Sequence, residues 1–182
     1  MRWKDTASSY GRVAIVNHWA LAAVVIALLV SGIVAGDLAD GALRTAIVGP
    51  HKAVGVLVLA LVAWMVAWWA WQRERPGPVP GTPRWEAFAR KAMHGLLLAG
   101  TVILSVSGIV MATFKGKPVD VFGLFTIPAQ AKTPWLAEAA HEVHVLGGWL
   151  LLAAVVGHAA VALKHHVLDH DATFARMVGR SA

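Results

Sequence analysis

The segment HVLGGWLLLAAVVGH places His144 and His158 at the two ends of a stretch without a charged residue. An α-helix has 3.6 residues per turn, so this separation is nearly four whole turns, and both rings leave the same helix face ~21 Å apart along the axis. An ionisable side chain inside a membrane span is costly and usually has a function there. The spacing therefore predicts two ligand positions on one helix, one near each membrane surface.

Each of these histidines has a candidate partner at its own depth. His51 begins the second long apolar segment, level with His144, and His18 lies near the inner end of the first, level with His158. Two neutral imidazoles that face each other across a helix bundle suit the axial positions of a low-spin b-type haem. We predict two haem b groups, held by the pairs His51/His144 and His18/His158.

Glycines accompany these histidines and support the haem interpretation, because a macrocycle between helices needs small residues where it passes the backbone. They are Gly55, Gly147, Gly148 and Gly157. Zinc is the alternative metal, but it normally needs four ligands at one depth, and neither level offers an obvious acidic or thiolate complement. The sequence contains no cysteine, which excludes disulfides, thiolate-held iron–sulfur clusters and covalent c-type haem attachment.

His94 is a further candidate at the inner level. We assign His158 as the ligand because it shares a helix face with His144, and we place His94 beside the inner haem or in a quinone site. His141, three residues before His144, is interpreted as a solvated residue of the outer loop.

His165 follows His158 by seven residues on almost the same face, just beyond the inner haem. Together with Arg84, His94 and His166 it is predicted to form a cationic pocket that supplies protons during quinone reduction. The alternative is that these side chains contact lipid phosphates at the membrane surface.

Four long apolar segments must position these residues: approximately 13–35, 50–71, 92–114 and 143–163. Each has the ~20 residues that a helix needs to cross a bilayer. The chain is 58% hydrophobic and 14% charged, whereas about a quarter of the residues in a soluble domain are charged. We predict an all-α, integral membrane four-helix bundle that forms a single domain over residues 1–182.

A cleavable signal peptide is the alternative interpretation of the first segment. Its apolar part is longer than the usual signal core, and the following GDLADGALR is a poor match to a cleavage site. We therefore expect four retained spans.

The positive charges predict the orientation of the bundle. Of the 16 Lys and Arg residues, five lie on the side opposite the termini: Arg44, Lys52, Lys115, Lys117 and Lys132. The other eleven lie near the termini and in the 73–91 connection, which places both termini in the cytoplasm. The net charge of +6 is thus a topology signal, and we predict no nucleic-acid partner.

Two further segments are predicted to lie at the membrane surfaces. Four tryptophans crowd the inner end of the second span and are interpreted as an interfacial aromatic belt: Trp64, Trp68, Trp69 and Trp71. The long outer loop, 115–142, contains the mildly apolar run VFGLFTIP and is expected to lie on the membrane over the bundle.

Motifs along the whole chain resemble the bacterial cytochrome b561 family of di-haem membrane cytochromes. They are VNHWAL, GPHKAVG, KAMHG, FGLFTIP, HEVH…GH…KHHV and the closing HDATFARM. The resemblance implies a multi-pass protein of the bacterial inner membrane whose haem ligands are His18 with His158 and His51 with His144. It also implies that His165 matches a quinone-contacting histidine, while Arg84 falls near a quinone-contacting lysine.

The same resemblance suggests two functional hypotheses. The first is an enzyme similar to superoxide oxidase, which takes electrons from periplasmic superoxide and reduces ubiquinone. The cations on the outer side would steer the superoxide anion, although five carboxylates share that side: Asp37, Asp40, Asp120, Glu138 and Glu142. The second is an electron-transfer subunit that is fed by a periplasmic redox protein or dehydrogenase and has no substrate of its own.

Overall fold

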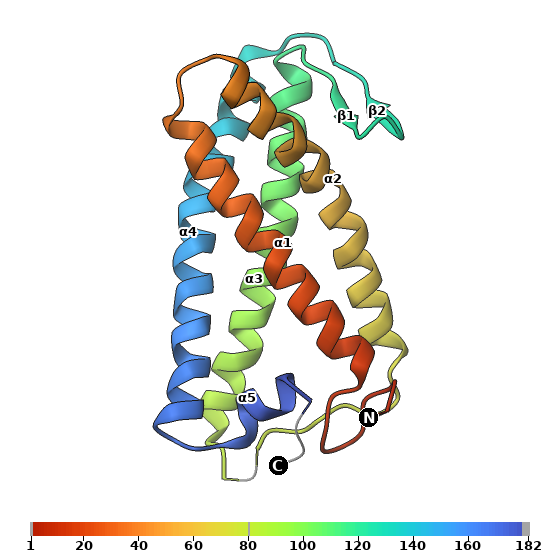
Figure 1. Ribbon diagram of the computed structural model, residues 1–182, viewed down its shortest axis with the longest axis vertical. Coiled ribbons are helices and arrows are strands. Elements are labelled where there is room, and N and C mark those ends of the chain that lie inside the picture. The colour runs from red at the N-terminus through yellow and green to blue at the C-terminus, as the bar shows by residue number, and fades with distance from the viewer. Residues whose placement is uncertain (1, 80, 180–182) are drawn as a thin grey trace.

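The computed structural model describes residues 2–79 and 81–179, which form four long helices, one short helix and a two-stranded hairpin (Figure 1). The elements are α1 (Arg12–Asp37), α2 (Ala42–Trp71), α3 (Arg84–Phe114), β1 (Val119–Val121), β2 (Phe125–Ile127), α4 (Pro134–Val167) and α5 (Ala172–Met177). Helices α1 to α4 are long and apolar enough to cross a membrane. The predicted mostly helical membrane bundle with four spans is confirmed.

Three of the long helices begin earlier than the apolar runs suggested. Helix α2 starts at Ala42 rather than near Pro50, so residues 42–49, which lie before the predicted span, are helical. The N–H of Thr45 bonds to the carbonyl of Gly41 and opens this helix, and Pro50 is accommodated within it. Hydropathy marks only the part of a helix that faces lipid, whereas helix propensity continues through polar turns.

Prolines mark the starts of the other two helices that were predicted too short. Helix α3 begins directly after Pro83, and α4 begins with Pro134 in its first turn. Proline suits the first turn of a helix because its missing N–H has no partner there in any case. The segment 134–142, assigned to the outer loop from the sequence, therefore belongs to α4.

Glycines bring α3 and α4 close together. A Cβ on Gly147 would lie 2.9 Å from Leu104 Cδ2, and one on Gly100 would lie 3.0 Å from Leu151 Cδ1. Small residues at such contacts let membrane helices approach until side chains interlock. Leu151 joins the buried core formed by Val25, Leu29 and Val58 at the centre of the bundle.

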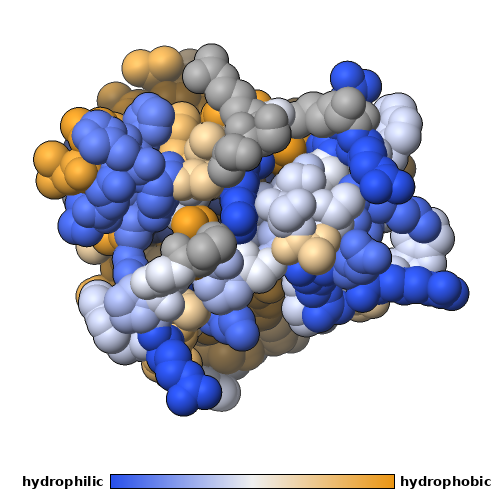
Figure 2. All heavy atoms as spheres, turned by 90° about the horizontal axis from the view of Figure 1, so that it is seen from below, coloured by the Kyte–Doolittle hydropathy of each residue, from blue (hydrophilic) through white to orange (hydrophobic). Residues whose placement is uncertain are grey.

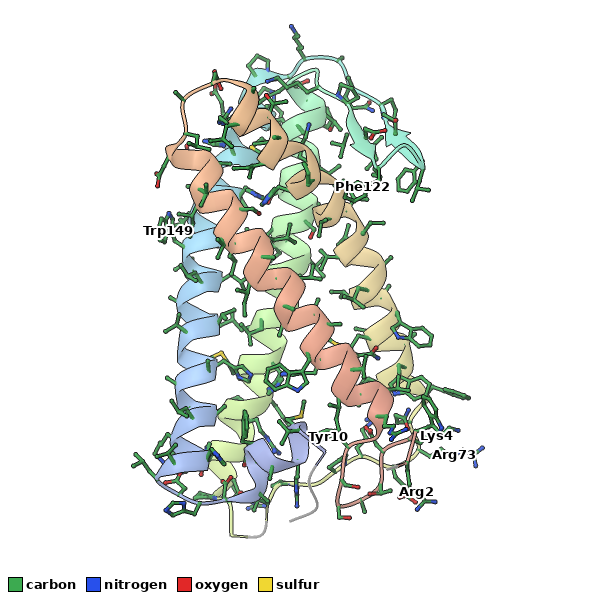
Figure 3. All side chains as sticks on the ribbon, viewed as in Figure 1. Arg2, Lys4, Tyr10, Arg73, Phe122 and Trp149 are labelled. Atoms are coloured by element: carbon green, nitrogen blue, oxygen red, sulfur yellow. The ribbon has the colours of Figure 1, made fainter. Side chains whose placement is uncertain are left out.

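The outer loop contains an antiparallel hairpin that the all-α expectation missed. Val119 pairs with Ile127, and the turn contains Phe122 and Gly123 at φ 53° and 72°. Val119 and Val121 are fully buried beside the outer end of α2, where the hairpin lies (Figure 1). Phe122 lies at the hairpin tip, 55% exposed (Figure 3).

The first and last described residues lie at the end of the bundle opposite the hairpin, which is called the inner end below (Figure 1). Three contacts tie the terminal segments together there: the N–H of Gly77 donates to Ala7 O at 3.2 Å, Trp19 Nε1 donates to Met177 O at 2.8 Å, and Arg176 Nη1 donates to Gly77 O at 3.0 Å. Seen from below, this end is covered largely by hydrophilic side chains (Figure 2). Arg180, which contributes to the predicted charge bias, lies outside the described residues.

Gly11→Ala is expected to detach the N-terminal segment. A Cβ at this position would fall 2.4 Å from Trp3 O and 2.5 Å from the carbonyl carbon of Lys4, so backbone must move. Such overpacking costs about 1–3 kcal/mol, and trypsin should cleave faster at Arg2 and Lys4 in the purified protein. Gly36→Ala is the control, because no described residue lies within 4 Å of its Cβ position. Equal cleavage rates in both variants would contradict this packing.

Candidate functional site

The outer histidine pair joins α2 to α4. The rings of His51 and His144 lie at 79° to each other with centres 6.0 Å apart. Ser31 Oγ lies 2.9 Å from His51 Nδ1, and the carbonyl of Leu104 accepts a 2.9 Å hydrogen bond from His144 Nδ1. A bond from Nδ1 to a carbonyl leaves Nε2 as the unprotonated nitrogen that can bind a metal.

A cavity of about 410 Å³ opens beside this outer pair. Its volume lies within the range of small-molecule and cofactor sites, about 300–1,000 Å³. Gly55 and Gly148 line it, and no described residue lies within 4 Å of a Cβ built on either. A larger side chain at these positions would fill the cavity, so their glycines keep the space between the helices open.

Two other glycines fit against the histidine rings themselves. A Cβ on Gly32 would lie 3.2 Å from His51 Cε1, and one on Gly108 would lie 3.0 Å from His144 Cε1. These approaches fix the lateral position of both rings. The sequence alone does not assign Gly32 and Gly108 to the site, because close helix packing explains such glycines equally well.

The inner cluster contains three histidines. His18 of α1, His94 of α3 and His158 of α4 converge at the inner end, and no described residue adds an acidic group in a metal-binding arrangement. The centres of the His18 and His158 rings are 6.3 Å apart, those of His18 and His94 are 6.5 Å apart, and those of His94 and His158 are 4.9 Å apart. The structure thus brings together the predicted inner pair and adds His94 to it.

The ring separations test whether these residues fit haem iron. A metal-bound imidazole nitrogen lies about 2.0–2.1 Å from the metal, and about 1.1 Å from its own ring centre, so two opposed ligands have centres about 6.3 Å apart. The pairs His51/His144 and His18/His158 both match this spacing. His94 and His158 are too close to hold one iron between them.

His94 remains a geometric alternative to His158 as the partner of His18. Its Nδ1 lies 2.7 Å from the carbonyl of Arg90 one turn earlier, which orients the ring. Ring distances therefore identify His18 as the common member of the inner site, and the shared helix face with His144 is the reason to choose His158.

His165 lies in surroundings that differ from the predicted cationic pocket. Its Nε2 is 2.9 Å from Glu86 Oε1, and its Nδ1 is 3.0 Å from carboxylate oxygens of both Asp169 and Asp171, without hydrogen-bond geometry at Nδ1. Carboxylates therefore surround the ring at both nitrogens, where the sequence had predicted other cations. A hydrogen bond from Lys164 lowers the pKa of Asp169 and keeps that group anionic.

The other residues proposed for the inner pocket are spread over its rim. Arg84 is exposed at the first position of α3, two residues before Glu86. His166 stacks against Phe174 of α5 with ring centres 5.0 Å apart. The carboxylates around His165 were missed from the sequence, because they come from α3 and from the turn after α4, which only folding brings together.

One prediction about a surface residue is wrong in part. His141 is exposed as expected, but it is part of α4 rather than of a loop; it lines the outer cavity and its Nδ1 lies 3.2 Å from Met111 Sδ. Trp68 differs from the other members of the predicted aromatic belt because its Nε1 is buried without a hydrogen-bond partner among the described residues. Trp69, its neighbour, is 57% exposed and stacks on Arg75.

Comparisons with known proteins point to one family. Residues 9–180 match the family model described as prokaryotic cytochrome b561. The chain is 32% identical over 187 residues to cytochrome b561 homolog 2 of Escherichia coli, covering 100% of this chain and 97% of that protein. It is also 32% identical over 108 residues to cytochrome b561 homolog 1 of the same organism, covering 58% of this chain and 60% of that protein.

Gly148→Leu is expected to reduce haem binding. The leucine side chain would enter the outer cavity, where no described residue lies within 4 Å of the Cβ position. Haem per chain, measured as the pyridine haemochrome, should fall, while Ala153→Leu at an exposed position of the same helix should leave it unchanged. Unchanged haem content in Gly148→Leu would show that this cavity does not hold the cofactor.

Proposed function

This chain belongs to the prokaryotic cytochrome b561 family, and we propose that it carries electrons through two b-type haems from a donor outside the membrane to a quinone at the inner face. Family membership makes it a multi-pass bacterial membrane electron-transfer protein that binds haem b. Its location in the inner membrane, with both termini in the cytoplasm, is part of the proposal and rests on the distribution of Lys and Arg.

The observation that carries the proposal is the stacking of two histidine pairs along one bundle. Their ring centres are 6.0 and 6.3 Å apart, one pair near each end of the membrane span. Haem b, when bound, supplies one-electron chemistry at its iron. A single pair would serve one surface only, whereas two pairs, each with one member on α4, would hold a redox centre in each leaflet.

The chain itself holds the ligands in place. Ser31 and the carbonyl of Leu104 orient the rings of His51 and His144, while Ser107 Oγ lies 3.2 Å from His144 Nδ1. These bonds orient the rings and tune how strongly each ligand donates to a metal. The buried core around Leu151 lies between the two levels.

Superoxide is the donor that we favour, with ubiquinone as the acceptor. Two superoxide anions, one ubiquinone and two protons would give two O₂ and one ubiquinol, so the reaction balances with electron entry outside and proton uptake inside. The outer cavity reaches Asp37 and His141 towards the outer end. Arg44 is paired with Asp40 at 2.7 Å, so steering of the anion would rest on the outer lysines.

Quinone reduction at the inner face would use His165, with His94 and Arg84 as further contacts. Quinone needs protons as well as electrons, and His165 lies at the inner end with carboxylates at both ring nitrogens. Glu86 and Asp169 connect that ring to the aqueous surface, because both are partly exposed. This arrangement supports a proton-donating role for His165.

A periplasmic redox protein is the alternative donor. The hairpin exposes three apolar side chains on the outer side, Phe122, Leu124 and Phe125, at 55%, 76% and 50%. An exposed apolar patch commonly marks an interaction surface. In this case the chain would transfer electrons for its partner and would have no substrate of its own.

Single alanine variants should show which histidines hold each haem. His144→Ala is expected to remove the outer haem and retain the inner one, so haem per chain should halve. His18→Ala should remove the inner haem, whereas His94→Ala should retain both if His158 is the ligand. Haem content and the low-spin signals in electron paramagnetic resonance measure this. Loss of one haem in His94→Ala would instead make His94 the partner of His18.

Stopped-flow mixing should identify the donor. The oxidised holoprotein is expected to develop the reduced b-haem α-band rapidly when superoxide is added anaerobically, and to reoxidise with a ubiquinone analogue. His165→Gln should slow the reoxidation at least tenfold and leave the reduction unchanged, because only the quinone step takes up protons. If superoxide does not reduce the haems but a periplasmic fraction does, the result would favour the alternative in which a partner protein supplies the electrons.

A further inference from the structure

Buried hydrogen-bond donors without acceptors gather at the inner end of the bundle. Among the described residues, the buried side-chain atoms without a hydrogen-bond partner are Asn17 Nδ2, Trp68 Nε1, Gln72 Nε2, His165 Nδ1 and Arg176 Nε. All are nitrogens, and all come from the inner ends of the helices or from α5. Buried polar groups in native proteins are nearly always paired, so this concentration requires an acceptor.

Three of these donors come from the surface formed by the inner ends of α1 and α2. Trp64 and Trp68 of α2 and Gln72, the residue that caps this helix, follow each other at intervals of four residues and so lie on one side of it. Asn17 Oδ1 accepts a 3.2 Å hydrogen bond from Trp64 Nε1, and the rings of Trp64 and Trp68 are 5.8 Å apart. Asn17 and Gln72 are only 7% and 6% exposed, so bulk water has little access to either amide.

The number of donors indicates the chemistry of the missing partner. Each unpaired amide group offers two N–H bonds and the indole offers one, and none of these groups accepts through its nitrogen. A carbonyl oxygen has two lone pairs, whereas a carboxylate has about four acceptor positions. A carboxylate is therefore the better complement to Asn17, Trp68 and Gln72 together.

The charges around this surface also favour an anion. Arg176 of α5 donates to the carbonyl of Gly77, five residues after Gln72, and its Nε has no partner among the described residues. Lys4 lies over the Trp71 ring at 4.3 Å, with the cations Arg2 and Arg73 at the same end (Figure 3). Asp5, an acid of this end, accepts the N–H of Gly11 at 2.7 Å.

We propose that Asn17, Trp68 and Gln72 bind a propionate carboxylate of the inner haem, an inference that rests on the proposed two-haem function. Asn17 directly precedes His18, the histidine shared by both geometrically acceptable inner pairs. Haem b carries two propionates, which are anionic acceptors attached to the same macrocycle that His18 would hold. The three donors fix the orientation of the macrocycle and neutralise part of the propionate charge.

This assignment has a consequence for the redox equilibrium of the inner haem. A carboxylate that keeps its full charge near the iron stabilises the more positive, ferric state. Hydrogen bonds from buried donors reduce this effect and favour the ferrous state. Removal of one donor should therefore lower the potential of the inner haem and leave that of the outer haem unchanged.

The test compares Trp68→Phe with Trp69→Phe in the purified holoprotein. The first substitution removes one buried N–H and keeps an aromatic ring, and the second makes the same change at a residue that is 57% exposed. At a fixed applied potential, the ferric-to-ferrous ratio of the inner haem should rise about tenfold in Trp68→Phe, as expected for a hydrogen bond to a charged group. It should not change in Trp69→Phe. Gln72→Leu provides a second variant with the same expected direction.

The outcomes distinguish the carboxylate from other partners. Loss of the inner haem alone in Trp68→Phe or Gln72→Leu would also support the assignment. An unchanged ratio with both haems retained would overturn it, and a raised KM for quinone in these variants would then identify a quinone carbonyl as the acceptor. If His18→Ala removes no haem, the two-haem function itself fails, and this assignment fails with it.

Discussion

The free-energy cost of burying an imidazole in an apolar membrane bundle governs how the helices of this protein are arranged. A titratable ring among apolar side chains loses its hydration, so it must find hydrogen-bond or metal partners at its own depth. At the outer level Ser31 and the carbonyl of Leu104 meet the Nδ1 atoms of His51 and His144. Both Nε2 atoms are then the nitrogens suited to a ligand, and the helices must leave space for it.

Glycines have two different roles in the spacing of the helices. Gly100 and Gly147 let α3 and α4 interlock, whereas Gly55 and Gly148 face an open cavity. Adjacent residues of α4, Gly147 and Gly148, thus serve opposite purposes, one closing a helix contact and one keeping a gap. The bundle is compact where apolar side chains meet and open where a planar cofactor fits.

The two ends of the bundle differ in chemistry as well as in exposure. The outer end combines a cavity with a hairpin whose tip exposes apolar side chains. The inner end is closed by the N-terminal segment, residues 72–79 and α5, which are joined by hydrogen bonds through Trp19, Gly77 and Arg176. Beneath this cover lie donors without acceptors on one side and a histidine among carboxylates on the other. Such a division is compatible with the proposed entry of electrons at one surface and uptake of protons at the other.

The sequence alone determined the four membrane spans and the depths of the four main histidines, because hydropathy and the 3.6-residue repeat are local properties of the chain. It also led to the family, through motifs around those same histidines. The sequence did not reveal that helices start at Ala42, Arg84 and Pro134, because polar helical turns carry no hydropathic signal. Only the tertiary structure decided which groups meet from distant segments: His94 with His158, Glu86 with His165, and Asn17 with Trp64. These contacts depend on how the helices rotate and cross, and that is set by packing among all four helices rather than by the pattern within any one of them.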